Sequence, residues 1–329
     1  MPTSSPTPKL PKLLERKIYK TGQTRGADDD EIYQNRVSRT STVLIPYGTW
    51  NLCRKFSYEN GYIVLIPPST YFQKLKLPDD LQQQGLELGR NALVFYEQRK
   101  DWEAYNPRVH KWKPATNRIA PLRGQYIARI PATTATEAGD KISFGFTATE
   151  KKGAGIRVYE YANSDTINNC RLQLEGLFWK CTDSLAVAVQ NGMEEKDAAN
   201  RKAHALLKCE EAKLLDSQKL IDARILNRAG HTICPLCLKE LSGAGFFAKM
   251  QQATGREVSD LTVTELNLFH INELRYGILN HCPYNLGWGH HHCNVVVKDA
   301  GINQTLEWMR ETLNRNIAEG YIAAANKPN

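Results

Sequence analysis

The sequence predicts an α+β protein with three parts behind an N-terminal arm. Short runs of β-branched and aromatic residues, separated by Gly, Pro and Asn, predict a β-rich domain over residues 41–190. A charged segment with apolar residues at helical spacing predicts a helical connector over residues 191–230. Two groups of Cys and His predict a metal-supported C-terminal domain over residues 231–329.

The N-terminal arm, residues 1–40, opens on a segment rich in Pro, Ser and Thr. We expect roughly the first ten residues to be disordered, because such a composition buries little apolar surface. Six basic residues then lie between Lys9 and Arg25, against the single acid Glu15. This balance fits either a solvated arm or an arm that contacts phosphates.

The β-rich domain is expected to contain six strands. They are predicted in the segments TVLIPYGTW, GYIVLIPP, ALVFYEQ, QYIARIP, KISFGF and IRVYEYA.

Within this domain, residues 104–136 contain no acid and interleave basic with aromatic residues. Basic side chains neutralise phosphates, and aromatic rings stack on bases or sugars, so the stretch is a candidate DNA-binding surface. The alternative is a solvated loop whose aromatic residues fill the core. The six basic residues are Arg108, Lys111, Lys113, Arg118, Arg123 and Arg129.

Two helices are predicted beyond residue 190. One long helix is expected over residues 194–226, ending before Gly230, and it would serve as a connector packed on one domain or as a dimer seam. A second, over residues 304–318, is amphipathic and is expected to cover the C-terminal domain, with Trp308 and Leu313 in the core.

Charge and cysteine content narrow the functional classes. The net charge of +8 and pI of about 9.0 favour a polyanionic partner. No apolar run approaches the length of a membrane span, and the N-terminus lacks the apolar core of a signal peptide, so we expect a cytoplasmic protein. In that reducing compartment the eight cysteines are not a disulfide scaffold, and close Cys pairs are interpreted as metal sites.

The C-terminal region holds two such groups. Cys234 and Cys237 form a Cys-x-x-Cys turn, which presents two thiolates to one metal, although alone it could equally be a redox pair. His290 and Cys293 repeat the spacing. These four residues predict a structural Zn²⁺ site, with Cys282 as the second choice of ligand and His292 a weaker one.

The spacing around this site resembles the HNH, or ββα-metal, nuclease family. Its zinc-supported members place an Asn five and eight residues before two zinc ligands and nine before the last motif residue, as Asn285 stands before His290, Cys293 and Asn294. His270, fifteen residues before Asn285, resembles the first His of the motif. The resemblance covers about 70 of the 329 residues.

The resemblance implies a role for each motif residue. His270 would activate a water as general base, Asn285 would hold the hairpin loop and orient that imidazole, and Asn294 would bind a catalytic Mg²⁺. One position departs from the family: Phe269 stands where many members carry an Asp or His that shares the metal. Glu265, Glu273 or a neighbouring His would then supply that ligand, or Asn294 would hold the metal with water and phosphate. An inactive relic is the remaining alternative.

A chain of this size with a large second domain resembles a type II restriction endonuclease. That assignment implies double-stranded DNA as substrate and a homodimer, because one such site cuts one strand. A homing endonuclease and a modification-dependent nuclease, with Trp102 or Trp112 in a pocket for a flipped base, are alternatives within the class. A zinc-containing DNA-binding protein that does not cut is the alternative outside it.

Overall fold

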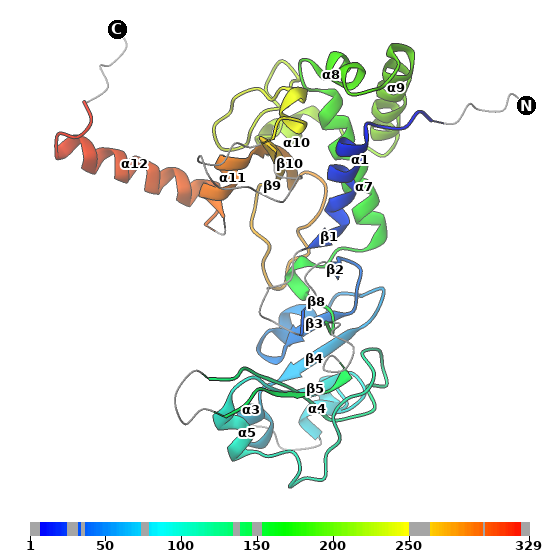
Figure 1. The fold of residues 1–329 in the computed structure, drawn as a ribbon, viewed down its shortest axis with the longest axis vertical. Coiled ribbons are helices and arrows are strands. Elements are labelled where there is room, and N and C mark those ends of the chain that lie inside the picture. Colours follow the sequence, from blue (N-terminus) through cyan, green and yellow to red (C-terminus); the bar gives the residue numbers. More distant parts are fainter. Residues whose placement is uncertain are drawn as a thin grey trace, which may run out of the picture. The chain divides into compact units, whose positions relative to one another are not determined.

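The computed structural model describes residues 7–24, 32–33, 37–73, 79–133, 139–146, 153–249, 264–298 and 300–323 (Figure 1). The chain divides into two compact units. Unit 1 comprises Met1–Thr21, Asn168–Glu273 and Asn280–Asn329, and unit 2 comprises Gly22–Ile167 with Leu274–Leu279. The mixture of helices and sheet agrees with the predicted α+β class. None of the described helices is long and apolar enough to span a membrane.

Unit 2 is built on a six-stranded sheet with the order β7-β6-β5-β4-β3-β8. Neighbouring strands run parallel, except that β7 is antiparallel to β6. All six segments predicted as strands form strands. They are β3 (Val43–Pro46), β4 (Tyr62–Ile66), β5 (Ala92–Tyr96), β6 (Tyr126–Ile130), β7 (Ile142–Phe144) and β8 (Ile156–Arg157).

Both faces of this sheet are buried, which explains why its central strands are continuous apolar runs. Val64 and Val94 face one core cluster, whereas Ile63 and Leu93 face the other. Short helices follow the strands: α2 (Trp50–Cys53), α3 (Pro68–Gln73), α4 (Asp79–Gln83) and α5 (Arg99–Ala104). A two-stranded ribbon, β1 (Gln23–Thr24) with β2 (Val37–Ser38), completes the named strands of the unit.

Unit 1 is helical around one short hairpin. Strands β9 (Leu266–His270) and β10 (Leu286–His290) pair antiparallel, and α11 (His291–Val297) follows β10 directly. The buried indole of Trp288 donates to the Leu174 carbonyl at 2.8 Å, which fixes the hairpin to α7. The remaining helices are α1 (Lys12–Tyr19), α7 (Ser164–Trp179), α8 (Ser184–Gln190), α9 (Glu195–Glu211), α10 (Ser217–Asp222) and α12 (Ile302–Ala318).

The structure differs from the sequence predictions in the helical regions. The first segment of unit 2 ends at Ile167, whereas the β-rich domain was expected to continue to residue 190, where α7 and α8 lie. The predicted single helix over residues 194–226 is two helices, because the chain turns at Lys213, whose φ is 55°. Buried apolar residues of both helices, such as Leu220, join the core of unit 1.

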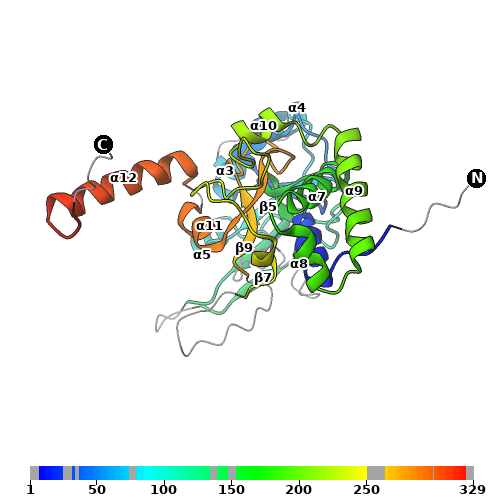
Figure 2. The same cartoon turned by 90° about the horizontal axis from the view of Figure 1, so that it is seen from above.

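Both ends of the chain also differ from expectation. Part of the basic arm forms α1, whose Leu14 and Ile18 join the core of unit 1, and the buried Lys17 ammonium donates to the Leu266 carbonyl at 2.8 Å. Lys17 is therefore not a phosphate contact. Helix α12 extends beyond α11 in both views (Figures 1 and 2). Trp308 and Leu313 are 54% and 48% exposed, so the prediction that they lie in the core is wrong.

Gly289 of β10 makes room for Phe269. Phe269 is fully buried and pairs across the hairpin with Gly287. A Cβ added to Gly289 would lie 2.6 Å from Phe269 Cδ2, closer than any normal contact. The aromatic ring therefore occupies space that a side chain on β10 would otherwise fill.

We predict that Gly289→Ala destabilises the protein by about 1–3 kcal/mol, because the methyl group overpacks the hairpin against Phe269. Thermal unfolding should show a lower Tm. Gly48→Ala is the matched control, since nothing lies within 4 Å of a Cβ there. Adding Phe269→Leu to Gly289→Ala should recover part of the loss, and equal Tm values for the Gly289→Ala and Gly48→Ala variants would contradict the packing account.

Candidate active site and metal centre

The β9–β10 hairpin brings chemically different residues to its two ends. His270, the last residue of β9, pairs with Leu286, the first of β10. At the opposite end, His290 pairs with Leu266. Four residue steps of extended strand, about 13 Å, separate the two ends.

The His290 end carries a compact group of metal-binding side chains. The donor atoms of Cys234, Cys237, His290 and Cys293 all lie within 4.8 Å of one another. Cys237 Sγ and His290 Nδ1 are 3.3 Å apart. The structure therefore brings together the four residues that the spacing selected. Among the described residues the group does not include Cys282, and His292 instead stacks on His290.

The donor set fits zinc. Tetrahedral Zn²⁺ binds thiolates at about 2.3 Å and imidazole nitrogen at about 2.0 Å, so its ligands stand within about 4 Å of one another. Burial raises the pKa of the Cys293 thiol, and the neighbouring thiols of Cys234 and Cys237 raise it further. A bound cation would offset that repulsion. Burial also lowers the pKa of His290, which favours the neutral imidazole that a metal binds.

At the opposite end, Asn285 holds the loop that joins the two strands. Its carboxamide nitrogen donates to the carbonyls of Asn272 at 3.0 Å and Asn280 at 2.6 Å. Its carboxamide oxygen accepts from the Asn272 amide at 2.7 Å, and its own carbonyl accepts from the Ile271 amide at 3.0 Å. These four bonds, three of them to the side chain, tie both sides of the loop to one buried residue, next to the residue pair Leu286 and His270.

His270 lies beside a second histidine that the sequence did not identify as functional. The Nε2 atom of His270 is 3.1 Å from Nδ1 of His281, and the rings are tilted by 51°. His281 is fully buried. No spacing rule identifies it, because the length of the hairpin loop between the strands is not fixed by the motif.

Asn294 lies close to β9 from the side of α11. Its carboxamide nitrogen donates to the Leu268 carbonyl at 3.3 Å. Leu268 is two residues before His270 on the same strand, about 7 Å along it. The structure therefore places Asn285 and Asn294 near the half of β9 that ends in His270.

Phe269 stands where many HNH nucleases carry a metal ligand, and two acids were considered as replacements. Glu265 and Glu273 lie at different ends of the hairpin. Glu265 directly precedes β9 at the cluster end, where its carbonyl accepts from the His291 amide at 2.7 Å. Glu273 follows His270 by three residues and lies beside Gly301, where an added Cβ would be 2.9 Å from its carboxylate. Of these two acids, only Glu273 is at the His270 end.

The six basic residues of the candidate DNA-binding surface are not equivalent. Arg129 is only 8% exposed, and its guanidinium donates to the Phe144 carbonyl at 2.7 Å, so it is not available to a phosphate. Arg118 is exposed but donates to the Gly153 carbonyl at 3.1 Å. The guanidinium of Arg108 lies 6.0 Å from the ring centre of Phe144. The side chains best placed to meet a phosphate are the remaining exposed four: Arg108, Lys111, Lys113 and Arg123.

The aromatic residues of this region pack on one another. Trp102 stacks on Phe144 with ring centres 5.4 Å apart. Trp112 stacks on Phe72 at 5.3 Å and meets Tyr71 edge-on at 5.2 Å. Their ring faces are thus engaged within the core cluster of unit 2, which gives no support to an aromatic pocket for a flipped base.

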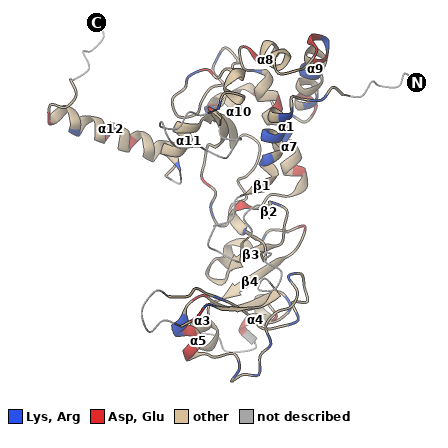
Figure 3. Ribbon diagram, in the orientation of Figure 1, with Lys and Arg blue, Asp and Glu red and all other residues tan. Residues whose placement is uncertain are grey.

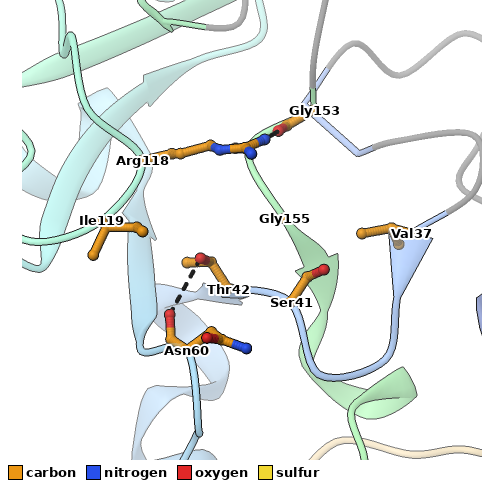
Figure 4. A pocket seen from close by; sticks show the side chains of 9 residues that line it. Val37, Ser41, Thr42, Asn60, Arg118, Ile119, Gly153 and Gly155 are labelled. Atoms are coloured by element: carbon orange, nitrogen blue, oxygen red, sulfur yellow. Dashed lines mark hydrogen bonds between the residues drawn. The ribbon is translucent and has the colours of Figure 1, made fainter. Parts of the chain in front are cut away.

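Two further features of the surface do not form a reactive site. Arg118 also borders a cavity of about 210 Å³ with Thr42, Asn60 and Gly155 (Figure 4). The last three precede the parallel strands β3, β4 and β8, the edge opposite to that at which such sheets bind ligands. Helix α9 carries acids and bases side by side (Figure 3), as expected of a solvated helix.

The profile of the BstXI restriction endonuclease family matches residues 16–291. The chain belongs to that family. The matched segment covers unit 2 and most of unit 1. It extends through His270, Asn285 and His290, and it ends before Cys293 and Asn294.

Other comparisons add little to the BstXI family assignment. A solved structure described as the crystal structure of a type II restriction endonuclease aligns with 16% identity and a TM-score of 0.29. The alignment covers 48% of this chain and 57% of the other, so the chain spans little more than half of that protein's length. No curated protein matches.

We predict about one zinc per chain in purified protein washed with magnesium, and its loss in Cys293→Ser. Because a structural zinc site contributes several kcal/mol, the variant should also melt lower by roughly 10 °C. Metal analysis and thermal unfolding measure both effects. Cys282→Ser is the matched control, since that thiol lies outside the group, and loss of zinc from it instead would contradict the assignment.

Proposed function

We propose that the chain is a sequence-specific endonuclease of type II that cuts double-stranded DNA, with the β9–β10 hairpin and α11 as an HNH site. The observation that carries this proposal is the position of His270 and Asn285 at one end of the hairpin, with the carboxamide of Asn294 on Leu268 in the middle of β9. Strand, strand and helix follow in the order typical of a ββα-metal site. Membership of the BstXI restriction endonuclease family supports the same activity.

In this proposal His270 acts as the general base. Hydrolysis of a phosphodiester requires a water to lose its proton as it attacks phosphorus, and an imidazole suits that step near neutral pH. Asn285 keeps the end of β9 and the following loop in one geometry, so that the imidazole does not have to be ordered during the reaction.

Magnesium is the expected catalytic cation, and it would stabilise charge on the phosphate and on the leaving 3′ oxygen. Asn294 would hold it through the carboxamide oxygen, because its nitrogen is committed to Leu268. Glu273 is the candidate for a further ligand. Zinc at the Cys and His group would be structural, since that group lies at the other end of the hairpin from His270.

Double-stranded DNA is the proposed partner, bound in part by the exposed basic residues of segment 104–136 in unit 2. Arg129 is left out of this surface because it is buried. A homodimer is the proposed working form, because two symmetry-related sites are needed to cut both strands at a near-palindromic sequence. As an enzyme that acts on DNA, the protein is expected in the cytoplasm.

The catalytic prediction concerns His270. With unmodified phage DNA and magnesium, wild-type protein should give discrete bands, and His270→Ala should lower the cleavage rate by about 100-fold or more while still binding DNA. His204→Ala is the control, because His204 is exposed on α9, and it should cut normally. Cleavage by His270→Ala at the wild-type rate would refute the base assignment, and DNA retention without cutting by wild type would favour the non-catalytic alternative.

A second prediction tests the DNA-binding surface. Arg108→Gln combined with Lys113→Gln should weaken binding to all sequences and reduce the slope of log K against log salt by about 0.9 for each phosphate that the protein no longer neutralises. Lys196→Gln with Lys208→Gln removes the same charge from α9 and should leave the slope unchanged. Filter binding at several salt concentrations measures both slopes. Equal slopes for the two double variants would show that Arg108 and Lys113 are not part of the DNA-binding surface.

A further inference from the structure

We infer that His281 is a positioning residue, which fixes the tautomer and orientation of His270 for its role as general base. The inference rests on the proposed function, because it assigns a partner to the base of that reaction. Its starting point is the 3.1 Å separation between His270 Nε2 and His281 Nδ1. At that distance one nitrogen donates a hydrogen bond and the other accepts it.

The residue that precedes His281 is held by two hydrogen bonds. His281 itself is fully buried in unit 1. The residue before it, Asn280, accepts a hydrogen bond at 2.6 Å from Asn285 through its carbonyl, and its side-chain amide donates to the Glu273 carbonyl. Asn285 thus fixes the backbone next to His281 as well as the backbone next to His270. The carboxamide of Asn285 therefore helps to fix the positions of both imidazoles.

The direction of the hydrogen bond follows from the chemistry that His270 must perform. A neutral imidazole carries its proton on one ring nitrogen, and the other nitrogen is the base. If His281 donated to Nε2 of His270, the proton of His270 would be on Nδ1, and its only lone pair would be committed to His281. If His270 donates from Nε2 instead, the lone pair is on Nδ1 and can accept a proton from water. In the proposed reaction His281 is therefore the acceptor.

This arrangement assigns a second route by which Asn285 supports catalysis. The first is its direct bonding to residues 271 and 272, which continue from His270. The second runs through Asn280 and His281 to the Nε2 atom of the base. A buried acceptor also stabilises the imidazolium that forms when His270 takes the proton, because the Nε2–H bond strengthens as the ring becomes charged.

Three substitutions separate positioning from packing. His281→Leu removes the acceptor, and we expect the single-turnover cleavage rate to fall about 10- to 100-fold with DNA affinity unchanged. His281→Asn places a carboxamide oxygen near the former Nδ1 position, so it should cut about tenfold faster than His281→Leu. His281→Gln has a side chain of similar polarity but places its oxygen nearer the former Nε2 position, and it should resemble His281→Leu. Zinc content and Tm provide the check on folding.

A spectroscopic measurement tests the inference without DNA or activity. Ring ¹⁵N spectra of histidine-labelled full-length protein, assigned with His270→Ala, report which nitrogen of His270 carries the proton. We expect the Nε2–H form in wild type and in His281→Asn, and a mixture of tautomers in His281→Leu. The two hypotheses can fail separately. If the proposed function is wrong, wild-type protein leaves the DNA uncut, but the His270 spectrum still shows the Nε2–H form.

Several outcomes would overturn the inference. A His270 ring with its proton on Nδ1 in wild type would reverse the direction of the bond. Equal cleavage rates for His281→Asn and His281→Leu, at equal Tm, would reduce His281 to a packing residue. Loss of one bound metal per chain in either variant, with the Cys and His group still loaded, would show that the two imidazoles are metal ligands instead.

Discussion

The proposed chemistry depends on a two-stranded hairpin whose two ends are held by different interactions. Five residue pairs alone would not keep such a hairpin in one conformation in water. At one end the Cys234, Cys237, His290 and Cys293 group can be closed by a metal. At the other end the four hydrogen bonds of Asn285 close the loop, each contributing about 1 kcal/mol.

Separating these two functions along the hairpin has a chemical advantage. Thiolates bind zinc far more readily than magnesium, whereas carboxamide and phosphate oxygens suit magnesium. About 13 Å of strand lies between His270 and the Cys and His group, so in the proposed site the thiolates are kept away from the general base. Phe269 fits this division, because its buried ring fills the space over Gly289 of β10. Many HNH nucleases carry a metal ligand at this position of the motif, whereas here the side chain is buried in the core.

Local patterns were enough to predict much of this molecule. The six strands of unit 2 were found because continuous apolar runs are a property of each segment alone. The Cys and His group was found because His290 and Cys293 repeat the spacing of Cys234 and Cys237. The parallel order β7-β6-β5-β4-β3-β8 was not predicted, because it depends on pairings between segments far apart in sequence. The break at Lys213 was missed because the helical periodicity continues across it.

The remaining misses involve tertiary contacts that no periodicity encodes. From the sequence, Lys17 and Arg129 are both possible phosphate contacts. In the structure, the Lys17 ammonium donates to the Leu266 carbonyl, and the Arg129 guanidinium donates to the Phe144 carbonyl of β7. Trp308 lies on an amphipathic helix, but only the first turns of α12 pack on the rest of unit 1, so its indole is exposed. His281 was missed for the same reason, because its proposed role also depends on a tertiary contact. Its importance comes from a 3.1 Å contact with His270 across a loop, and neither residue type nor spacing predicts that contact.

The central claim is that the His270 imidazole and the Asn294 carboxamide act on one phosphate at the Asn285 end of the hairpin. A crystal structure of the protein with uncleaved duplex and Mn²⁺, using anomalous scattering to place the cation, tests it most directly. We predict manganese on the carboxamide oxygen of Asn294, with the scissile phosphate between the cation and His270. Manganese and phosphate bound elsewhere, with His270 distant from both, would contradict this claim.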